Sequence, residues 1–294
     1  MAAAADAGFI AGAFYGWLAR RTSSSYTPGA GYPMGSLATP DSPSVDTVYS
    51  AYKLVGVVET GIPAPTRELA SARGGLVIMG QRAMGVSDFG SFDLTLAYHD
   101  ETVQQMCGGS AVDVTTHGNL AITAPNTGNA NLNQLILGIC VGIQTDSGDN
   151  QFLTMVFGNV QITYPQISAG QDSGVNPRPV TCTVVPSLSD RVGWGMLYSA
   201  TGLSVQNDAD MVTYVRYTYP MHLVTYIDNG STGGFTLPYL PTSNEASNAT
   251  NIVLESGAKS NPTSINTSTG AVAMTAADSG DPWTLLYGTN FISS

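Results

Sequence analysis

Residues 152–188 constrain the fold most, because they are typical of one long strand, a polar loop and a returning strand. Between Phe152 and Tyr164, alternating residues fall into two sets on either side of Gly158 and Asn159. This pattern indicates a strand that is interrupted by a bulge or a tight bend. The chain is therefore expected to be built around a β-sheet to which this strand belongs.

The second half of the same stretch predicts the loop and the return. Pro165 ends the pairing because proline has no N–H to donate, and residues 168–179 are rich in Gly, Ser, Asp, Asn and Pro. The run Val180–Val185 alternates apolar and hydroxyl side chains and stops at Pro186. Together these features predict a two-faced β-hairpin with a long polar tip. Cys182 lies inside the return strand and is expected to be a small buried hydrophobic residue.

The rest of the pattern predicts a mainly β fold with one short helix. Residues 92–98 alternate so that their aromatic and leucine side chains share one strand face. Residues 99–109 are expected to form the helix, with Asp100 as the N-cap and Gly108 as the end. Further strands are predicted at 50–59, 66–91, 111–123, 131–145, 210–227, 235–240 and 252–256, with a β-meander at 263–291. The fold class expected from these elements is a helix-decorated β-sandwich.

The chain is expected to divide into three parts. These are an N-terminal arm and linker at 1–44, a β-sandwich domain at 45–200 and a C-terminal β portion at 201–294. Residues 1–21 are rich in alanine and are predicted to form a helix or arm that docks on the body or on a neighbouring subunit. Their arginines follow the apolar run, whereas a signal peptide carries its cations first, and the run is short for a membrane span. Neither secretion nor membrane insertion is expected.

Composition bears on the partners that the chain can bind. Only 11% of its 294 residues are charged, and 10 Lys+Arg against 21 Asp+Glu give a formal net charge of −11. A protein that grips nucleic acid needs a basic surface to neutralise phosphates, and this chain has few cations to supply one. An acidic channel would instead let a polyanion pass without sticking. The 3 cysteines have no metal-binding spacing, and their odd number does not indicate a disulfide framework.

No motif in the sequence indicates catalysis, so the protein is expected not to be an enzyme and to need no cofactor or metal. His99, Asp100 and Glu101 are the one close grouping of a histidine with carboxylates, but helix capping already explains both acids. His117 and His222 have no partners at ligand spacing and are expected to be polar or half-buried strand residues. A nucleophile elbow, a phosphate-binding loop and a zinc-protease motif are all missing from the sequence.

Three pieces of the chain together resemble the major tail tube proteins of tailed bacteriophages. They are the N-terminal arm, the strand-then-helix segment AMGVSDFGSFDLTLAYHDETVQQMCGG at 83–109, and the hairpin at 152–188. The resemblance covers residues 45–190 and rests on pattern. Residues 257–291 also look like small β domains that are appended to several kinds of phage virion protein. The long N-terminal arm and the C-terminal portion depart from the minimal pattern of the family.

The resemblance implies a structural virion subunit with a tail-tube-like β-sandwich or barrel-forming core. Such subunits assemble into stacked homohexameric rings around a channel, through which DNA passes without specific binding. The implied partners are other copies of the chain, the tape measure, the tail terminator and baseplate components, and assembly takes place in the cytoplasm of the bacterial host. Contacts between subunits are expected at Tyr164, Pro165, Gln166, Gln171, Asp172, Asn176, Arg178, Phe14 and Trp17.

Two alternatives remain open at the level of the sequence. A capsid decoration protein, or another surface protein of the head or tail, would share the β fold without forming tubes. A glycan-binding module of a receptor-binding apparatus would use exposed tyrosines such as Tyr217 and Tyr219, because flat rings stack on sugar faces. Alternating aromatic residues are, however, also ordinary in strand cores and in subunit interfaces.

Overall fold

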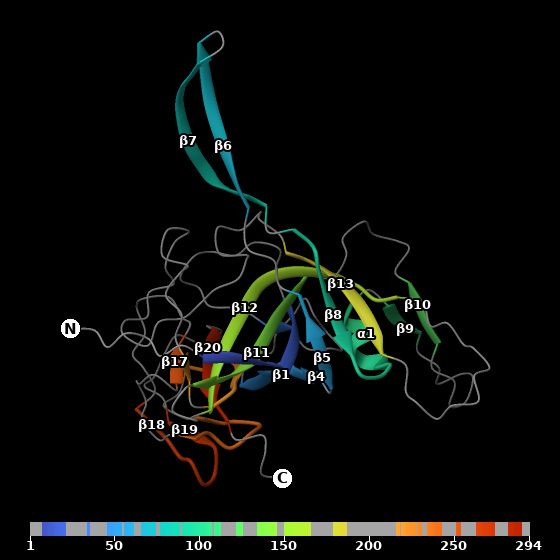
Figure 1. Ribbon diagram of the computed structural model, residues 1–294. Coiled ribbons are helices and arrows are strands. Elements are labelled where there is room, and N and C mark those ends of the chain that lie inside the picture. The colour runs from blue at the N-terminus through green and yellow to red at the C-terminus, as the bar shows by residue number, and fades with distance from the viewer. Residues whose placement is uncertain are drawn as a thin grey trace.

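A computed structural model shows a mainly β protein with one short helix in its described part, α1 at Glu101–Cys107 (Figure 1). The structure describes residues 8–21, 34–35, 46–54, 56–61, 66–74, 77–88, 90–107, 109–112, 122–125, 134–145, 150–165, 179–186, 216–217, 219–227, 229–230, 234–242, 251–253, 263–273 and 282–289. The expected fold class, mainly β with a barrel-like sheet, is confirmed.

The main antiparallel sheet curves into a nearly closed barrel. Its central strands are, in spatial order, β1 (Gly8–Arg21), β11 (Leu135–Thr145), β12 (Asn150–Thr163), β13 (Val180–Pro186), β8 (Phe92–Leu96) and β5 (Val57–Thr60). The short strand β4 (Tyr52–Leu54) pairs with the free edge of β1, and the chain then bends directly into β5. Gly56 has a φ of 72°, which glycine adopts without steric penalty, so the bend can be tight. The segment β4–β5 thus joins both ends of the sheet.

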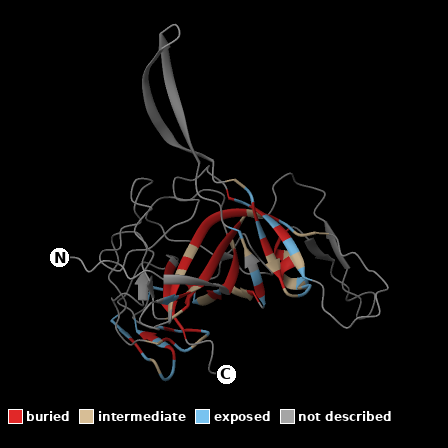
Figure 2. Ribbon diagram, viewed as in Figure 1, coloured by how far each residue is buried: buried red, intermediate tan, exposed pale blue. Residues whose placement is uncertain are grey.

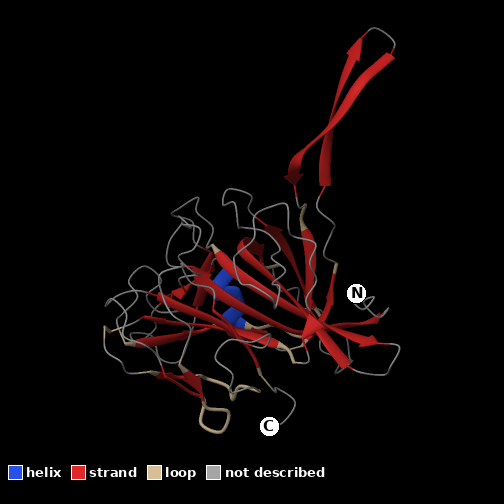
Figure 3. Cartoon of the chain, turned by 90° about the vertical axis from the view of Figure 1, so that its left-hand side faces the viewer, coloured by secondary structure: helices blue, strands red, loops and turns tan. Residues whose placement is uncertain are grey.

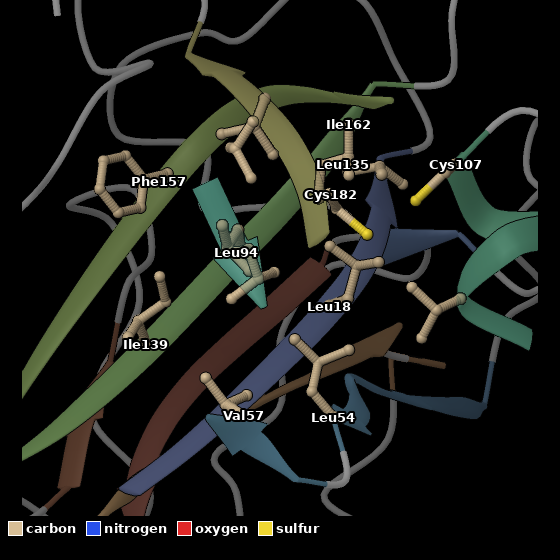
Figure 4. Close-up of a cluster of buried hydrophobic side chains, with 14 of the residues drawn as sticks. Leu18, Leu54, Val57, Leu94, Cys107, Leu135, Ile139, Phe157, Ile162 and Cys182 are labelled. Carbon is tan, nitrogen blue, oxygen red and sulfur yellow. The ribbon is translucent and has the colours of Figure 1, made fainter. Parts of the chain in front are cut away.

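Side chains that point inward fill the barrel. In β8 and β13 every second residue is buried, so the alternation in the sequence becomes one inner and one outer face. Helix α1 covers part of this core with Val103, Met106 and Cys107. Figure 4 shows many of these side chains converging between the strands. The barrel core consists of Leu18, Leu54, Val57, Phe92, Leu94, Leu96, Val103, Met106, Cys107, Leu135, Leu137, Ile139, Val141, Phe157, Val160, Ile162, Cys182 and Val184.

A second sheet packs on the outside of the barrel wall formed by β1, β11 and β12. Its order is β17 (Asn251–Val253), β20 (Pro282–Gly288), β15 (Met221–Ile227) and β3 (Thr47–Ser50). The outer core between the two sheets consists of Tyr15, Trp17, Ala19, Tyr49, Ala51, Ile136, Cys140, Val156, Met221, Leu223, Ile227 and Leu286. Strand β15 is buried along its whole length, because a third sheet covers its other face. Figure 2 shows the buried residues that follow the long strands of the barrel wall. The strands of the third sheet are β16 (Phe235–Thr236), β19 (Ala271–Ala273) and β18 (Ser264–Ile265).

The interruption expected near Gly158 and Asn159 is a β-bulge. Leu137 pairs with Phe157 and Leu135 pairs with Val160, so β12 has one more residue than β11 between these two pairs. Because of the extra residue, Val156 faces the outer core and Val160 faces the barrel core, although both have even numbers. The bulge therefore lets one strand serve two hydrophobic cores.

The predicted hairpin and helix cap are confirmed. Strand β12 pairs antiparallel with β13, and the tip at 166–178 lies outside the described residues. Asp100 Oδ1 accepts hydrogen bonds from the backbone N–H groups of Thr102 at 2.9 Å and Val103 at 3.2 Å, as an N-cap does. Cys182 is fully buried as expected. Tyr98 does not share the face of β8, because it follows the strand and is exposed.

The prediction of a helix or peripheral arm for residues 1–21 is wrong for 8–21. These residues form β1, which lies between β11 and β4 in the barrel wall. Pairing along both edges overrides the helical preference of its alanines. The run predicted at 50–59 as one strand is divided among β3, β4 and β5, since each piece pairs with a different partner.

The C-terminal meander is correct only in its first part. Strands β18 and β19 form a hairpin around the turn that contains Gly270, which has a φ of 72°. Strand β20 instead leaves this hairpin and pairs with β15 and β17 in the second sheet. Strand β3 pairs with β15 as well, so segments on both sides of residue 200 share one sheet and one core.

Three shorter pairings involve further strands of the body. Strand β2 (Met34–Gly35) pairs with the end of β1, and β14 (Arg216–Tyr217) pairs with β12. Strands β9 (Gly109–Val112) and β10 (Ile122–Pro125) form a separate two-stranded sheet beside α1 (Figure 1). The strand predicted at 111–123 thus overlaps β9 at 111–112 and β10 at 122–123, and residues 113–121 lie outside the described residues.

Candidate assembly surfaces

A long hairpin extends from the barrel away from the rest of the chain. It consists of β6 (Thr66–Gly74) and β7 (Val77–Asp88), which pair with each other in a sheet of their own. Figures 1 and 3 show it extending far from the body. At about 3.3 Å per residue, the nine residues of β6 span roughly 30 Å. Among the described strands, none besides these two pairs with either edge of the hairpin.

The hairpin continues the paired strands β5 and β8 of the barrel. Strand β5 precedes β6, and β7 precedes β8, so the hairpin leaves the barrel where these two neighbouring strands meet. The sequence predicted strands here from local pattern. It did not predict the projection, because periodicity reports which residues alternate and not whether another layer covers them.

The charge of the hairpin differs from that of the whole chain. Residues 70–82, which form the outer half because Ala70 pairs with Arg82, contain Arg73 and Arg82 but no aspartate or glutamate, whereas the chain as a whole carries a net charge of −11. The same segment includes the apolar run Leu76–Met79. The outer half of the hairpin is therefore cationic and partly apolar in composition.

The second candidate surface is the outer face of β5, β8, β13 and the end of β12. The second sheet covers β1, β11 and the first part of β12, but most of the residues that point outward here are exposed, with Thr95 half-buried. Two pairs across this face are Thr183 with Asp93 and Thr163 with Thr183. The hydroxyl oxygens of Thr95 and Thr181 lie 3.2 Å apart. Exposed members of the face, which we name the open face, are Val58, Ser91, Asp93, Thr163, Thr181, Thr183 and Val185.

Tyr164 anchors the base of the polar loop that follows β12. Its hydroxyl accepts a hydrogen bond from the backbone N–H of Asp100 at 3.0 Å and lies 2.9 Å from Nδ1 of His99. Tyr52 donates to Oδ2 of Asp100 at 2.9 Å, so the N-cap of α1 is tied to two tyrosines. Partial burial raises the pKa of Tyr164, and its ring packs against the barrel core. This cluster holds the helix and the root of the loop together.

The predicted contact residues fall into different environments. Tyr164 and Pro165 are half-buried at the root of the loop. Trp17 is fully buried, and its Nε1–H donates to the backbone oxygen of Met221 at 3.0 Å, so its ring packs within its own chain. Phe14 lies in β1, and its side chain is outside the described part. The remaining candidates, Gln166, Gln171, Asp172, Asn176 and Arg178, lie outside the described residues.

His222 is fully buried, which corrects the expectation of a half-buried histidine. Its Nδ1 lies 2.7 Å from the hydroxyl of Tyr15, and its Nε2 lies 2.8 Å from Oγ of Ser50. Burial lowers the pKa of His222 to about 3, with a smaller contribution from Lys53. The ring is therefore neutral at physiological pH. Its partners are distant in sequence, so no local pattern could have placed it in the core.

The contacts of His222 include a serine hydroxyl, and the tautomer of the ring decides which group donates in each hydrogen bond. Ser50 Oγ donates to the backbone oxygen of Ala51 at 3.2 Å. If Tyr15 donates to Nδ1, then Nε2–H donates to Ser50, and every group in the chain of hydrogen bonds is satisfied. In this arrangement the imidazole cannot accept the serine proton. The network joins β1, β3 and β15 beside the outer core.

The tyrosines that suggested a glycan platform are only partly within the described residues. Tyr217 is in β14, and Tyr219 follows that strand and is half-buried, so the two do not lie on one described strand. His117, Trp194, Tyr198 and Tyr214 lie outside the described residues. Within the described part, no cluster of three or more His, Cys, Asp or Glu side chains could hold a metal ion.

Comparisons with models of protein families, with curated proteins and with solved structures found no match to this chain. In the part of the chain that the structure describes, no helix is both long enough and apolar enough to cross a membrane. Self-assembly is therefore inferred from the geometry of the two surfaces and the composition of the chain.

Proposed function

We propose that this chain is a structural virion subunit that assembles with copies of itself into stacked hexameric rings, forming the tail tube of a bacteriophage. The observation that carries the self-assembly is the hairpin β6–β7, which extends from the body without a described strand on either edge. Its identity as a tail protein rests on the resemblance of residues 45–190 to the tail tube family.

The physics of an isolated hairpin favours a partner. A two-stranded hairpin is at best marginally stable in water, because it has no third strand and no layer to bury its apolar residues. Its free edges also present unpaired N–H and C=O groups, which invite pairing with another chain. In an assembly of identical subunits, one copy would supply the missing neighbour for the hairpin of the next.

The body has the properties that a ring subunit requires. Its barrel is stabilised by its own core, and the second sheet covers one half of the outer wall, so the fold does not depend on the hairpin. The open face on the other half carries threonine, serine and valine with few charges, which can be buried against a neighbour at a small desolvation cost. The net charge of −11 suits a channel that DNA crosses without adhering.

Electron microscopy of the purified protein at increasing concentration tests this function. We expect six-fold rings, stacks of rings or hollow filaments with an open channel. A protein that remains dispersed at the highest concentration, or that forms trimers which coat capsids, would refute the tube and favour a decoration protein.

A shortened hairpin provides the matched variant for this experiment. Replacing residues 69–84 by a two-residue Asn-Gly turn removes the projecting half and keeps the strands that join β5 and β8. We expect the variant to keep the circular dichroism spectrum of a β protein and to lose stacking. Stacks that form as readily as those of the unmodified chain would contradict a role of the hairpin in assembly.

A further inference from the structure

The open face is chemically complementary to the outer half of the hairpin. Asp93 is an exposed carboxylate on β8, opposite the exposed Thr183 of β13. The surrounding exposed residues are uncharged: Thr163, Thr181 and Val185 on β12 and β13, and Val58 on β5, which is 58% exposed. A face of this kind suits a partner with a few cations and apolar side chains. Residues 70–82 have that composition.

The hairpin of the same chain is directed away from this face. It continues β5 and β8 beyond the end of the barrel, and Figures 1 and 3 show it extending away from the barrel strands. A second copy, displaced along the direction of the hairpin, would bring its own open face next to the projecting strands. The hairpin, roughly 30 Å long at 3.3 Å per residue, is long enough to cover strands such as β8 and β13, which have five and seven residues.

We propose that the outer half of the hairpin of one copy lies on the open face of a second copy, with Arg73 or Arg82 paired to Asp93. This inference rests on the proposed self-assembly and assigns its contact. Valine and threonine side chains of the face bury the apolar residues of the hairpin, and the ion pair fixes the orientation of the two copies. Charge pairs across interfaces contribute more to orientation and partner choice than to affinity.

Charge reversal tests the contact. Asp93→Lys places a cation opposite the hairpin arginines, and the double variant Arg73→Glu, Arg82→Glu places carboxylates opposite Asp93. Each protein alone is expected to need a concentration about tenfold higher or more for assembly, since a repulsive pair in place of an attractive one changes the free energy by at least about 1.4 kcal/mol. The two proteins mixed in equal amounts are expected to assemble together, because each supplies the surface that the other lacks.

The matched control is Glu101→Lys. Glu101 is an exposed carboxylate on α1 and not on the open face, so the same change of net charge is made elsewhere. We expect its assembly to match that of the unmodified chain at equal ionic strength. Thermal unfolding of each variant shows that the body is intact, because exposed substitutions of this kind change stability by about 0.5 kcal/mol or less.

The outcomes separate this inference from the proposed function. If the unmodified chain forms rings and Asp93→Lys assembles at the same concentration, the contact is refuted and self-assembly stands. If Glu101→Lys impairs assembly as much as Asp93→Lys, net charge and not the contact is responsible, and the contact is again refuted. If the unmodified chain never assembles, both proposals fail. Selective loss with recovery on mixing supports the contact.

Discussion

Gly138→Ala is expected to destabilise the fold strongly. Gly138 pairs directly with Trp17 across β11 and β1, and the indole ring occupies the space where a side chain at position 138 would lie. A Cβ atom there would overlap Cε2 and Cζ2 of Trp17, far closer than real Cβ contacts allow. The ring cannot move easily, because it is fully buried and its Nε1–H is bonded to the backbone oxygen of Met221 at 3.0 Å.

The expected loss follows from these contacts. Overpacking a core typically costs about 1–3 kcal/mol. Displacing the indole would also break its buried hydrogen bond, which adds about 1 kcal/mol. The sum, about 2–4 kcal/mol, is a large part of the stability of an ordinary domain, which is about 5–15 kcal/mol. The midpoint of urea unfolding, followed by tryptophan fluorescence at concentrations below assembly, measures the loss.

Two further variants test whether the clash with Trp17 causes the loss of stability. Gly61→Ala is the control, because nothing lies within 4 Å of the added methyl group, and we expect a change of about 0.5 kcal/mol or less. In a Trp17→Leu background the penalty of Gly138→Ala should shrink, since the smaller side chain leaves room for the methyl group. A Gly138→Ala protein as stable as Gly61→Ala, or a penalty that persists unchanged with Trp17→Leu, would refute this packing.

Three other predictions address the third sheet, the buried histidine and the helix cap. Gly234→Ala should unfold at lower urea concentration, because the new methyl group would overlap the backbone oxygen of Val272 where β16 meets β19. His222 is neutral in the fold, with a pKa of about 3 against about 6.5 in the unfolded chain. Its contribution to the free energy of unfolding should therefore be fully present above pH 6.5. Between pH 6.5 and pH 3 this contribution should fall by up to about 1.4 kcal/mol per pH unit, because only the unfolded chain binds the proton. His222→Gln should lack this part of the slope in urea titrations at each pH. Asp100→Ala should lose about 1–2 kcal/mol in thermal unfolding, whereas Glu101→Ala, which removes only an exposed side-chain contact, should change little.

Local pattern predicted the elements whose causes are local. The alternation in 180–185 and the break near Gly158 and Asn159 correctly predicted β13 and the bulge in β12. Asp100 was correctly predicted as the N-cap, because a cap depends on residues two and three positions away. These features follow from strand period, turn composition and capping chemistry, which a short stretch contains in full.

The features that the sequence did not predict depend on distant partners. Residues 8–21 belong to the alanine-rich run at 1–21, but they form a strand because β11 and β4 pair with its two edges. The closure of the barrel by β4 and β5, and the pairing of β3 with β15, also join segments that no window of the sequence contains together. The expected contact residue Trp17 is buried for the same reason, since its partners Gly138 and Met221 are far along the chain.

The two halves of the barrel wall nevertheless differ in sequence in a way that bears on assembly. Leu135–Val141 is apolar almost throughout, because β11 lies between the barrel core and the outer core and is buried on both faces. Val180–Pro186 alternates with threonine, because only one face of β13 meets a core. In a monomer, the threonine-bearing face of β13 lies in water. In a ring of identical subunits, the next copy can cover this face of threonine and valine without burying many charges. The same pattern therefore accounts for the fold of one chain and, on our proposal, for the surface that receives the hairpin of another.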